Sequence, residues 1–363
     1  MYSEADLQSA VAAGALSPEA ANALRSHAAG IRSAPVADEE HFRLITGFND
    51  IFVTIACMLV IFAAAALGGN IAAGVGGLLV AAACWAMAEM FTRRRRMALP
   101  SIVLLLGFVA GLGFAAAAFV GLFLPEHIVS DSYVWEGKTE RWSYEDRYPW
   151  QDALMSGAGG LAAALAAFAH WKRFRVAITI AAGVGALVML ILSLIAAALN
   201  QKPSEASLVI PAALVCGLGV FAYAMRWDIG DRQRTTQKAD IAFWLHLLAA
   251  PLIAHPLFYW MGVTKAQHIG LGVATGVLAI YAFFAVVALS IDRRALLVSA
   301  LAYVLIALGQ LLRQYGAVEL NLAITGLVIG SALLCLSAFW SPIRSTVVSK
   351  LTDGLRERLP ATA

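Results

Sequence analysis

The chain of 363 residues is 61% hydrophobic and only 13% charged, with a mean hydropathy of +0.76, whereas about a quarter of the residues in a soluble domain are charged. This composition excludes an ordinary soluble protein and predicts one that is embedded in a lipid bilayer. The formal net charge of +3 gives no reason to expect a nucleic-acid partner. The basic residues lie beside apolar stretches, where they are expected to face anionic lipid headgroups.

Residues 1–45 are polar and are expected to form a short cytoplasmic helical hairpin followed by a linker. Ser17 is placed to cap the second helix, with Pro18 at its first position, and Gly14 supplies a left-handed turn between the helices. Such a hairpin is too small to be stable alone, so it predicts a protein partner at residues 3–29 or support from the membrane part. The residues expected to join the two helices are Leu7, Val11, Leu16, Ala20 and Leu24.

The segment from Leu7 to Leu24 reads Leu-Gln-Ser-Ala-Val-Ala-Ala-Gly-Ala-Leu-Ser-Pro-Glu-Ala-Ala-Asn-Ala-Leu. Placed before a run of membrane helices, it resembles a bacterial family of multi-pass membrane proteins, the domain-of-unknown-function family numbered 2157. The resemblance is limited to the N-terminal part of the chain. It implies membrane topology and bacterial origin, and it implies no activity.

Ten apolar stretches follow the hairpin. Each has the length of a transmembrane helix, which needs about 20 residues to cross a ~30 Å hydrocarbon core. They are residues Ile51–Leu67, Ile71–Phe91, Leu99–Leu124, Ala153–Ala169, Val176–Leu199, Leu208–Met225, Ile241–Met261, Ile269–Ile291, Leu296–Leu312 and Leu320–Trp340. The sequence therefore predicts an all-α polytopic membrane protein in which residues 46–341 form a bundle of ten helices.

The basic residues give this bundle an orientation. With ten spans and the N-terminus inside, 20 of the 26 Lys and Arg residues fall on the inner side and only six on the outer side. Basic residues concentrate on the cytoplasmic side of membrane proteins. We therefore expect both termini to lie in the cytoplasm. The family resemblance implies in addition that the membrane is a bacterial inner membrane.

Two extramembrane segments carry further patterns. Residues 125–150 form the only long outer loop, where aromatic residues stand among acids. This pattern indicates an interfacial aromatic belt on a small hairpin that turns at Glu136-Gly137-Lys138, or a lid for a cationic or sugar-like ligand. In residues 342–363, apolar residues at helical spacing alternate with basic ones. They predict an amphipathic helix on the inner leaflet, although a partner-binding helix would have the same pattern.

Two pairs of glycines predict close helix packing. Gly107 and Gly111 in the third span, and Gly326 and Gly330 in the tenth, have the four-residue spacing of small-residue interfaces in membranes.

The seventh span holds the most unusual candidate site. It contains His246, Pro251, His255 and Pro256. Each proline removes a backbone donor and is expected to break the helix and free a carbonyl one turn earlier. Broken helices near the bilayer midplane form substrate and ion sites in many transporters. The alternative is that both histidines are hydrogen-bonded packing residues.

A second group of polar residues lies at the outer ends of the ninth and tenth spans. It comprises Gln310, Arg313, Glu319 and Asn321. Arg313 can reach the lipid headgroups and Glu319 can cap a helix. The functional interpretation is a polar vestibule that opens outward and includes His255.

Motifs for catalysis are absent from the sequence. It contains no Walker loop, no HExxH zinc motif and no GxSxG nucleophile elbow, so we expect no catalytic residues, no cofactor and no metal, and an enzyme is the third-ranked interpretation. The four cysteines fall in four separate spans without metal-ligand spacing; they are Cys57, Cys84, Cys216 and Cys335.

The leading hypothesis for the function is a small-molecule or lipid-type transporter of the inner membrane. The alternative is a non-transporting membrane scaffold or sensor that recruits partners through the N-terminal hairpin and the outer loop. A transporter must hold a polar cavity that reaches the midplane, whereas a scaffold can be solid throughout.

Overall fold

A computed structural model describes residues 4–24, 48–135, 138–200, 208–232, 234, 236–263, 271–314, 321–356 and 359. The chain divides into two units, residues 1–42 and 43–363.

The first unit contains α1 (Glu4–Ala12) and a second helix that begins at Pro18. Gly14 lies between them with φ +69°, a left-handed conformation that glycine adopts without a steric penalty. The hydroxyl of Ser17 accepts a hydrogen bond from the Ala20 amide at 3.1 Å, which confirms Ser17 as the helix cap.

One detail of this hairpin corrects the sequence analysis. Ala21 is 1% exposed, whereas Ala20 and Leu24 are exposed. Successive residues of a helix are rotated by about 100° around its axis. The buried face of the second helix therefore contains Ala21 instead of the expected Ala20 and Leu24.

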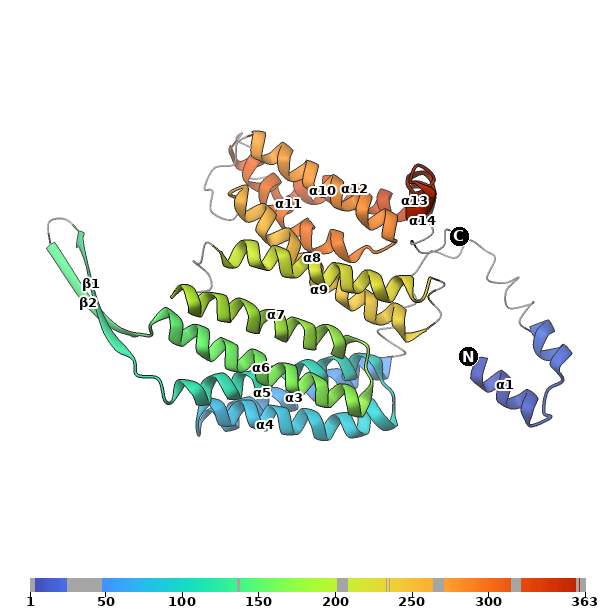
Figure 1. Cartoon of the computed structure of the whole chain (residues 1–363), viewed down its shortest axis with the longest axis horizontal. Helices are drawn as coiled ribbons and strands as arrows, with labels where there is room; N and C mark the ends of the chain where they lie inside the picture. Colours follow the sequence, from blue (N-terminus) through green and yellow to red (C-terminus); the bar gives the residue numbers. More distant parts are fainter. Residues whose placement is uncertain are drawn as a thin grey trace. The chain divides into compact units, whose positions relative to one another are not determined.

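The second unit consists mainly of long apolar helices (Figure 1). Among the described residues, eight helices are long and apolar enough to cross a membrane. They are α3 (Phe48–Gly69), α4 (Ala73–Ala88) with its π-helical continuation η1 (Glu89–Arg94), α5 (Ala98–Gly121), α6 (Pro149–Phe174), α7 (Ile178–Leu199), α8 (Val209–Ile229), α9 (Gln237–Trp260) and α10 (Leu271–Ile291).

The remaining helices are α11 (Ala295–Gln314), α12 (Asn321–Ala338), α13 (Trp340–Ser349) and α14 (Asp353–Arg356). The part of α12 from Gly330 onward meets α13 at an angle of 70°, and counting this bent pair as one span raises the number to nine. Where the structure describes them, all ten apolar stretches are mainly helical, which confirms the multi-span helical class. The number of ten spans is not confirmed.

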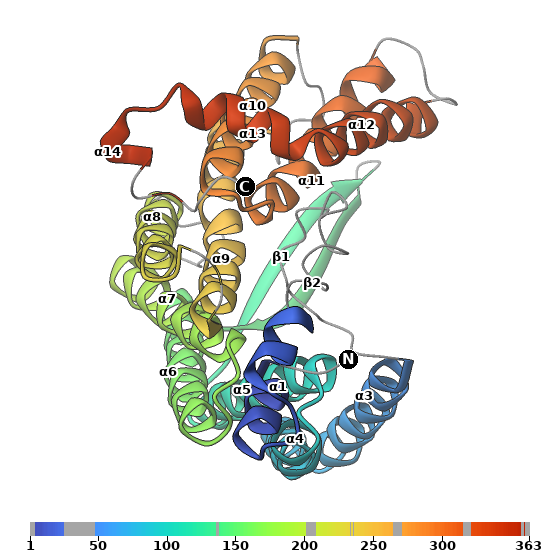
Figure 2. The ribbon, with the colours of Figure 1, turned by 90° about the vertical axis from the view of Figure 1, so that its right-hand side faces the viewer.

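The helices pack largely in chain order. Each helix from α3 to α7 contacts the next, α9 packs against α7, α8 and α11, and α10 packs against α11 and α13. Figure 2 views most of these helices nearly end on, so that the row can be followed from α3 to α11. Two large apolar cores result among the described residues, a first within α3–α7 and a second within α7–α13 and the tail, beside a small third one shared by α6, α7 and α8. Helix α7 contributes to both large cores, with Ala186 in the first core and Val188 in the second.

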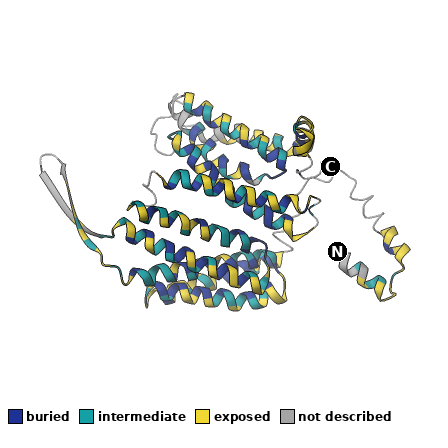
Figure 3. Ribbon diagram, in the orientation of Figure 1, coloured by how far each residue is buried: buried dark blue, intermediate teal, exposed yellow. Residues whose placement is uncertain are grey.

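Exposed residues recur along these helices (Figure 3), and many of them are large and apolar. Phe62 of α3 is 63% exposed and Leu165 of α6 is 61% exposed. A soluble monomer rarely exposes apolar surface over several helices. These faces are therefore suited to contact with lipid.

The glycine pair in the third span behaves as expected. A Cβ atom at Gly111 of α5 would lie 2.7 Å from the carbonyl oxygen of Gly77 in α4, and one at Gly77 would lie 2.5 Å from that of Gly111. The two backbones are thus in direct contact, which confirms close packing here. Around Gly326 and Gly330 of α12, no described heavy atom lies within 4 Å of such a Cβ, so the second motif makes no comparable contact.

The outer loop contains a β-hairpin. Strands β1 (His127–Trp135) and β2 (Lys138–Asp146) pair antiparallel, with Trp135 opposite Lys138. Glu136 and Gly137 therefore connect the strands, as the sequence predicts. Most of the aromatic side chains on the strands lie outside the described part, so the choice between belt and lid stays open.

The C-terminal tail packs more closely on the bundle than the sequence suggests. In α13, Arg344 and Val348 are each 3% exposed, and Leu359 is 7% exposed and belongs to the second core. This corrects the expectation that these apolar residues lie on lipid. The physical reason is that the tail finds both an apolar surface and, at Asp292, a partner for its polar groups.

Candidate functional site

Three ionisable side chains meet inside the bundle. Asp228 is the penultimate residue of α8, His246 lies in α9, and Arg293 lies in the connection between α10 and α11. Their side chains are 1%, 0% and 2% exposed. We refer to Asp228, His246 and Arg293 as the buried triad.

The carboxylate of Asp228 is at the centre of the triad. Its Oδ1 accepts from Nη2 of Arg293 at 2.5 Å, and its Oδ2 lies 2.9 Å from Nε2 of His246 and 3.4 Å from Nε of Arg293. The same Nη2 also donates to the backbone oxygen of Ala239 in α9 at 3.1 Å. The triad therefore joins α8, α9 and the α10–α11 connection.

Local structure explains why Arg293 reaches this position. Asp292 has φ +56°, a left-handed conformation that aspartate tolerates better than most residues. The Arg293 amide donates back to the Ala288 oxygen at 2.9 Å, which closes the end of α10. The carboxylate of Asp228 lies at the C-terminal end of α8, where the helix dipole is negative and destabilises a negative charge. The guanidinium of Arg293, which this turn brings close, offsets that cost.

The protonation of His246 follows from its partner. A carboxylate only accepts hydrogen bonds, so Nε2 of His246 carries the hydrogen and Nδ1 is the bare nitrogen. Nδ1 is buried and has no hydrogen-bond partner among the described residues, and the ring lies 5.1 Å from that of Phe221. With a neutral imidazole, the charges of Asp228 and Arg293 cancel, and the triad is neutral as a whole.

A second polar cluster lies beside the triad, centred on Asp292. Its carboxylate accepts from Nη1 of Arg234 and from Nε1 of Trp340, each at 2.8 Å, and lies 3.5 Å from Nε of Arg344. Arg234 also donates to the backbone oxygens of Ile291 and Asp292. This cluster ties the α8–α9 connection and α13 to the end of α10.

The two predicted histidines are not brought together. His246 has no exposed surface and lines no cavity, which corrects the expectation of a cavity at this residue. His255 is exposed, and its Nδ1 lies 2.7 Å from the Tyr303 hydroxyl of α11.

The expected breaks at Pro251 and Pro256 are also corrected. Helix α9 continues from Gln237 to Trp260 through both prolines. A proline removes one backbone hydrogen bond, but a helix in a membrane bundle can stay continuous when neighbouring helices pack around the proline. Helices α7, α8 and α11 pack against α9 in this way.

The outer polar group stays a prediction. Gln310 and Arg313 belong to α11, and Asn321 begins α12, but the positions of these three side chains are outside what the structure describes. Glu319 lies outside the described residues altogether.

Sequence reasoning missed Asp228 and Arg293. Arg293 had only been counted as one of the inner basic residues, and Asp228 had not been singled out. The available signal was an acidic residue at the C-terminal end of an apolar helix, which is unfavourable with the helix dipole and indicates a cationic partner. The sequence does not say which of the many Arg and Lys residues that partner is.

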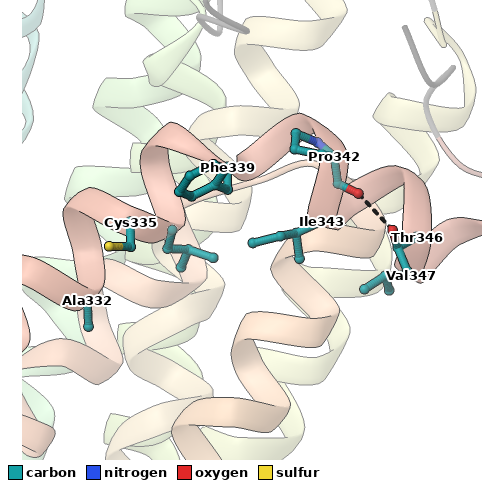
Figure 4. A pocket seen from close by; sticks show the side chains of 8 residues that line it. Ala332, Cys335, Phe339, Pro342, Ile343, Thr346 and Val347 are labelled. Atoms are coloured by element: carbon teal, nitrogen blue, oxygen red, sulfur yellow. Dashed lines mark hydrogen bonds between the residues drawn. The ribbon is translucent and has the colours of Figure 1, made fainter.

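Two other features were considered as binding sites. A groove of about 630 Å³ lies in the angle between α12 and α13 (Figure 4). Its lining is almost wholly apolar, and the hydroxyl of Thr346 is already bonded to the Pro342 oxygen at 2.9 Å, so it offers little to a polar substrate. Within the described ranges, no three His, Cys, Asp or Glu residues are arranged to hold a metal ion.

The fold defines a class: a polytopic helical protein with lipid-compatible outer faces and an ionisable cluster inside. Comparisons with protein-family models, characterised proteins and solved structures found no match. The function therefore has to be argued from the site itself.

Proposed function

We propose that this chain transports a small molecule across the membrane, and that the buried triad holds together the helices that separate during transport. The observation that carries the proposal is the triad itself, because Asp228, His246 and Arg293 are all at most 2% exposed. Of the three, His246 lies within the seventh span, whereas Asp228 at the end of α8 and Arg293 in the α10–α11 connection lie towards the proposed cytoplasmic side. Buried ionisable groups in a membrane bundle are costly and mark substrate or ion pathways in many membrane proteins. For stability alone, apolar residues of similar volume serve as well or better.

The proposal requires a second conformation. In the conformation described above, His246 is 0% exposed. A substrate path past His246 is therefore closed in this conformation. The triad joins three elements through side chains and one backbone oxygen, with no backbone–backbone link between them at Asp228. Opening therefore needs Arg293 to leave Asp228 and Ala239, which would let the α10–α11 connection move away from α9.

Cysteine accessibility tests this second conformation without knowledge of the substrate. Ala242 and Ala249 are both 0% exposed and lie one turn before and after His246 on the same face of α9. In protein whose four native cysteines are replaced by Ser, we expect Ala242→Cys and Ala249→Cys to react with a small water-soluble methanethiosulfonate in nanodiscs. Mass spectrometry of the intact protein measures the reaction.

The matched control is Ala166→Cys, a 4% exposed position in the first core, which should stay unmodified until the protein is denatured. If Ala242→Cys and Ala249→Cys are as inert as this control, the interior does not open and the transport proposal fails.

We also propose ten spans with both termini in the cytoplasm of a bacterial inner membrane, on the basis of the basic-residue distribution. In the cysteine-free background, an impermeant maleimide added to intact cells should modify Thr139→Cys in the outer hairpin. It should spare Thr235→Cys in the α8–α9 connection until the cells are lysed. Labelling of Thr235→Cys in intact cells would reverse the proposed orientation.

A membrane scaffold or sensor is the second candidate. It is favoured by the separation of residues 1–42 as a unit of their own, which suits recruitment of a partner. The accessibility experiment separates the two candidates, because a scaffold leaves Ala242→Cys unreacted.

A further inference from the structure

Two hydrogen-bond donors, an imidazole and a guanidinium, share one carboxylate in the triad. Arg293 occupies Oδ1 of Asp228 at 2.5 Å, and Nε2 of His246 lies at 2.9 Å from Oδ2. As long as His246 is neutral, a single positive charge balances Asp228. If His246 gains a proton, two positive charges face one carboxylate in a site that is closed to solvent.

The bare nitrogen of His246 is where such a proton would bind. Nδ1 is buried and has no hydrogen-bond partner among the described residues, so its lone pair is available. A protonated Nδ1 becomes a donor and needs an acceptor, and none of the described residues supplies one in this conformation, so water that enters the site would be the acceptor. Protonation of His246 is therefore linked to entry of water, and hence to opening.

The charges around His246 do not offset an added proton. Asp228 on α8, Arg293 on the α10–α11 connection and Arg234 on the α8–α9 connection all interact electrostatically with His246. On α9 itself, Asp240 interacts with Arg293. Helix α7, which also packs against α9, has no ionisable residue between Ile178 and Leu199. Arg234 is paired with Asp292, whose carboxylate lies 2.8 Å from its Nη1, and Arg293 is paired with Asp228. A proton on His246 therefore places a second positive charge beside the single carboxylate of the triad.

We propose that His246 is the binding site of the coupling proton and that protonated His246 displaces Arg293 from Asp228; this rests on the proposed transport function. One proton from water binds Nδ1, and the imidazolium keeps its Nε2–H bond to Oδ2. The excess charge is removed when the guanidinium of Arg293 leaves Oδ1 and the Ala239 oxygen for water. Loss of the proton on the other side returns His246 to its neutral form and Arg293 to Asp228, so one proton is taken up and one released per cycle.

Distance measurements between spin labels test this exchange. Lys238 at the start of α9 and Val298 in α11 are both exposed, and they lie on the two sides of the Arg293–Ala239 contact. In cysteine-free protein in nanodiscs, we expect labels at these positions to show one distance at high pH. A second, longer distance should appear as the pH is lowered, because acid favours the protonated imidazole.

His246→Gln should remove the response. Glutamine can donate to Asp228 but cannot gain a proton, so the labels should report the single short distance at every pH. The matched control is His170→Gln, because His170 of α6 is also a buried histidine, 1% exposed, bonded to Thr179 rather than to a carboxylate. This control should retain the response. If His246→Gln does not fold, His246→Asn makes the same test.

The outcomes separate this inference from the transport proposal. An unchanged distance at all pH values, or a response that persists in His246→Gln, overturns the proton site. If Ala242→Cys nevertheless reacts with the thiol reagent, the chain still opens and another ion drives it. If the cysteine stays inert as well, both proposals fail.

Discussion

Arg293→Ala is expected to lower the free energy of unfolding by about 3–5 kcal/mol, because removing one partner of a buried ion pair leaves an uncompensated charge. The carboxylate of Asp228, which is 1% exposed in the intact protein, would keep only a neutral imidazole as a donor. Unfolding in detergent, followed by tryptophan fluorescence during a titration with sodium dodecyl sulfate, measures the change.

The control for this experiment is Arg226→Ala, since Arg226 lies in the same helix as Asp228 but is exposed. Its loss should change stability by less than about 0.5 kcal/mol. The double variant Asp228→Asn with Arg293→Met removes both charges and should recover most of the lost stability. If Arg293→Ala is no more damaging than Arg226→Ala, the ion pair does not hold the helices together.

The same double variant also separates stability from function. It should fold, yet it has no carboxylate for which a protonated His246 and Arg293 can compete. Its spin-label distance should therefore no longer depend on pH.

Gly111→Ala is expected to destabilise the bundle by about 1–3 kcal/mol, the usual range for overpacking a tight interior. The new Cβ would lie 2.7 Å from the Gly77 oxygen and 3.1 Å from the Ala81 nitrogen. Both are backbone atoms of α4, so no side chain can turn aside and the helices have to part. The same titration in detergent measures the loss.

Gly330→Ala is the matched control, because it has the same spacing motif and a Cβ there meets nothing described within 4 Å. It should be neutral or stabilising, since alanine is favoured over glycine in a helix by up to about 1 kcal/mol. Equal effects of the two substitutions would mean that the α4–α5 contact is not tight.

The sequence by itself determined the features that depend on neighbouring residues. The helices follow from the length of the apolar stretches, which does not depend on the fold. Gly14 and Ser17 end and begin helices through their own backbone and hydroxyl groups. The point at which the two strands of the hairpin reverse, between Trp135 and Lys138, follows in the same way from alternation and turn chemistry.

The tertiary structure alone decided which distant residues meet. Asp228 lies 18 residues from His246 and 65 from Arg293, and no local pattern selects this pair of partners. The two glycine motifs have the same spacing, but only Gly111 faces a backbone. Helix α9 stays continuous through its prolines because of the helices around it. In each case the outcome depends on how closely two segments approach that are far apart in the sequence. Helix propensity and hydrophobic periodicity describe only neighbouring residues, so they cannot predict this approach.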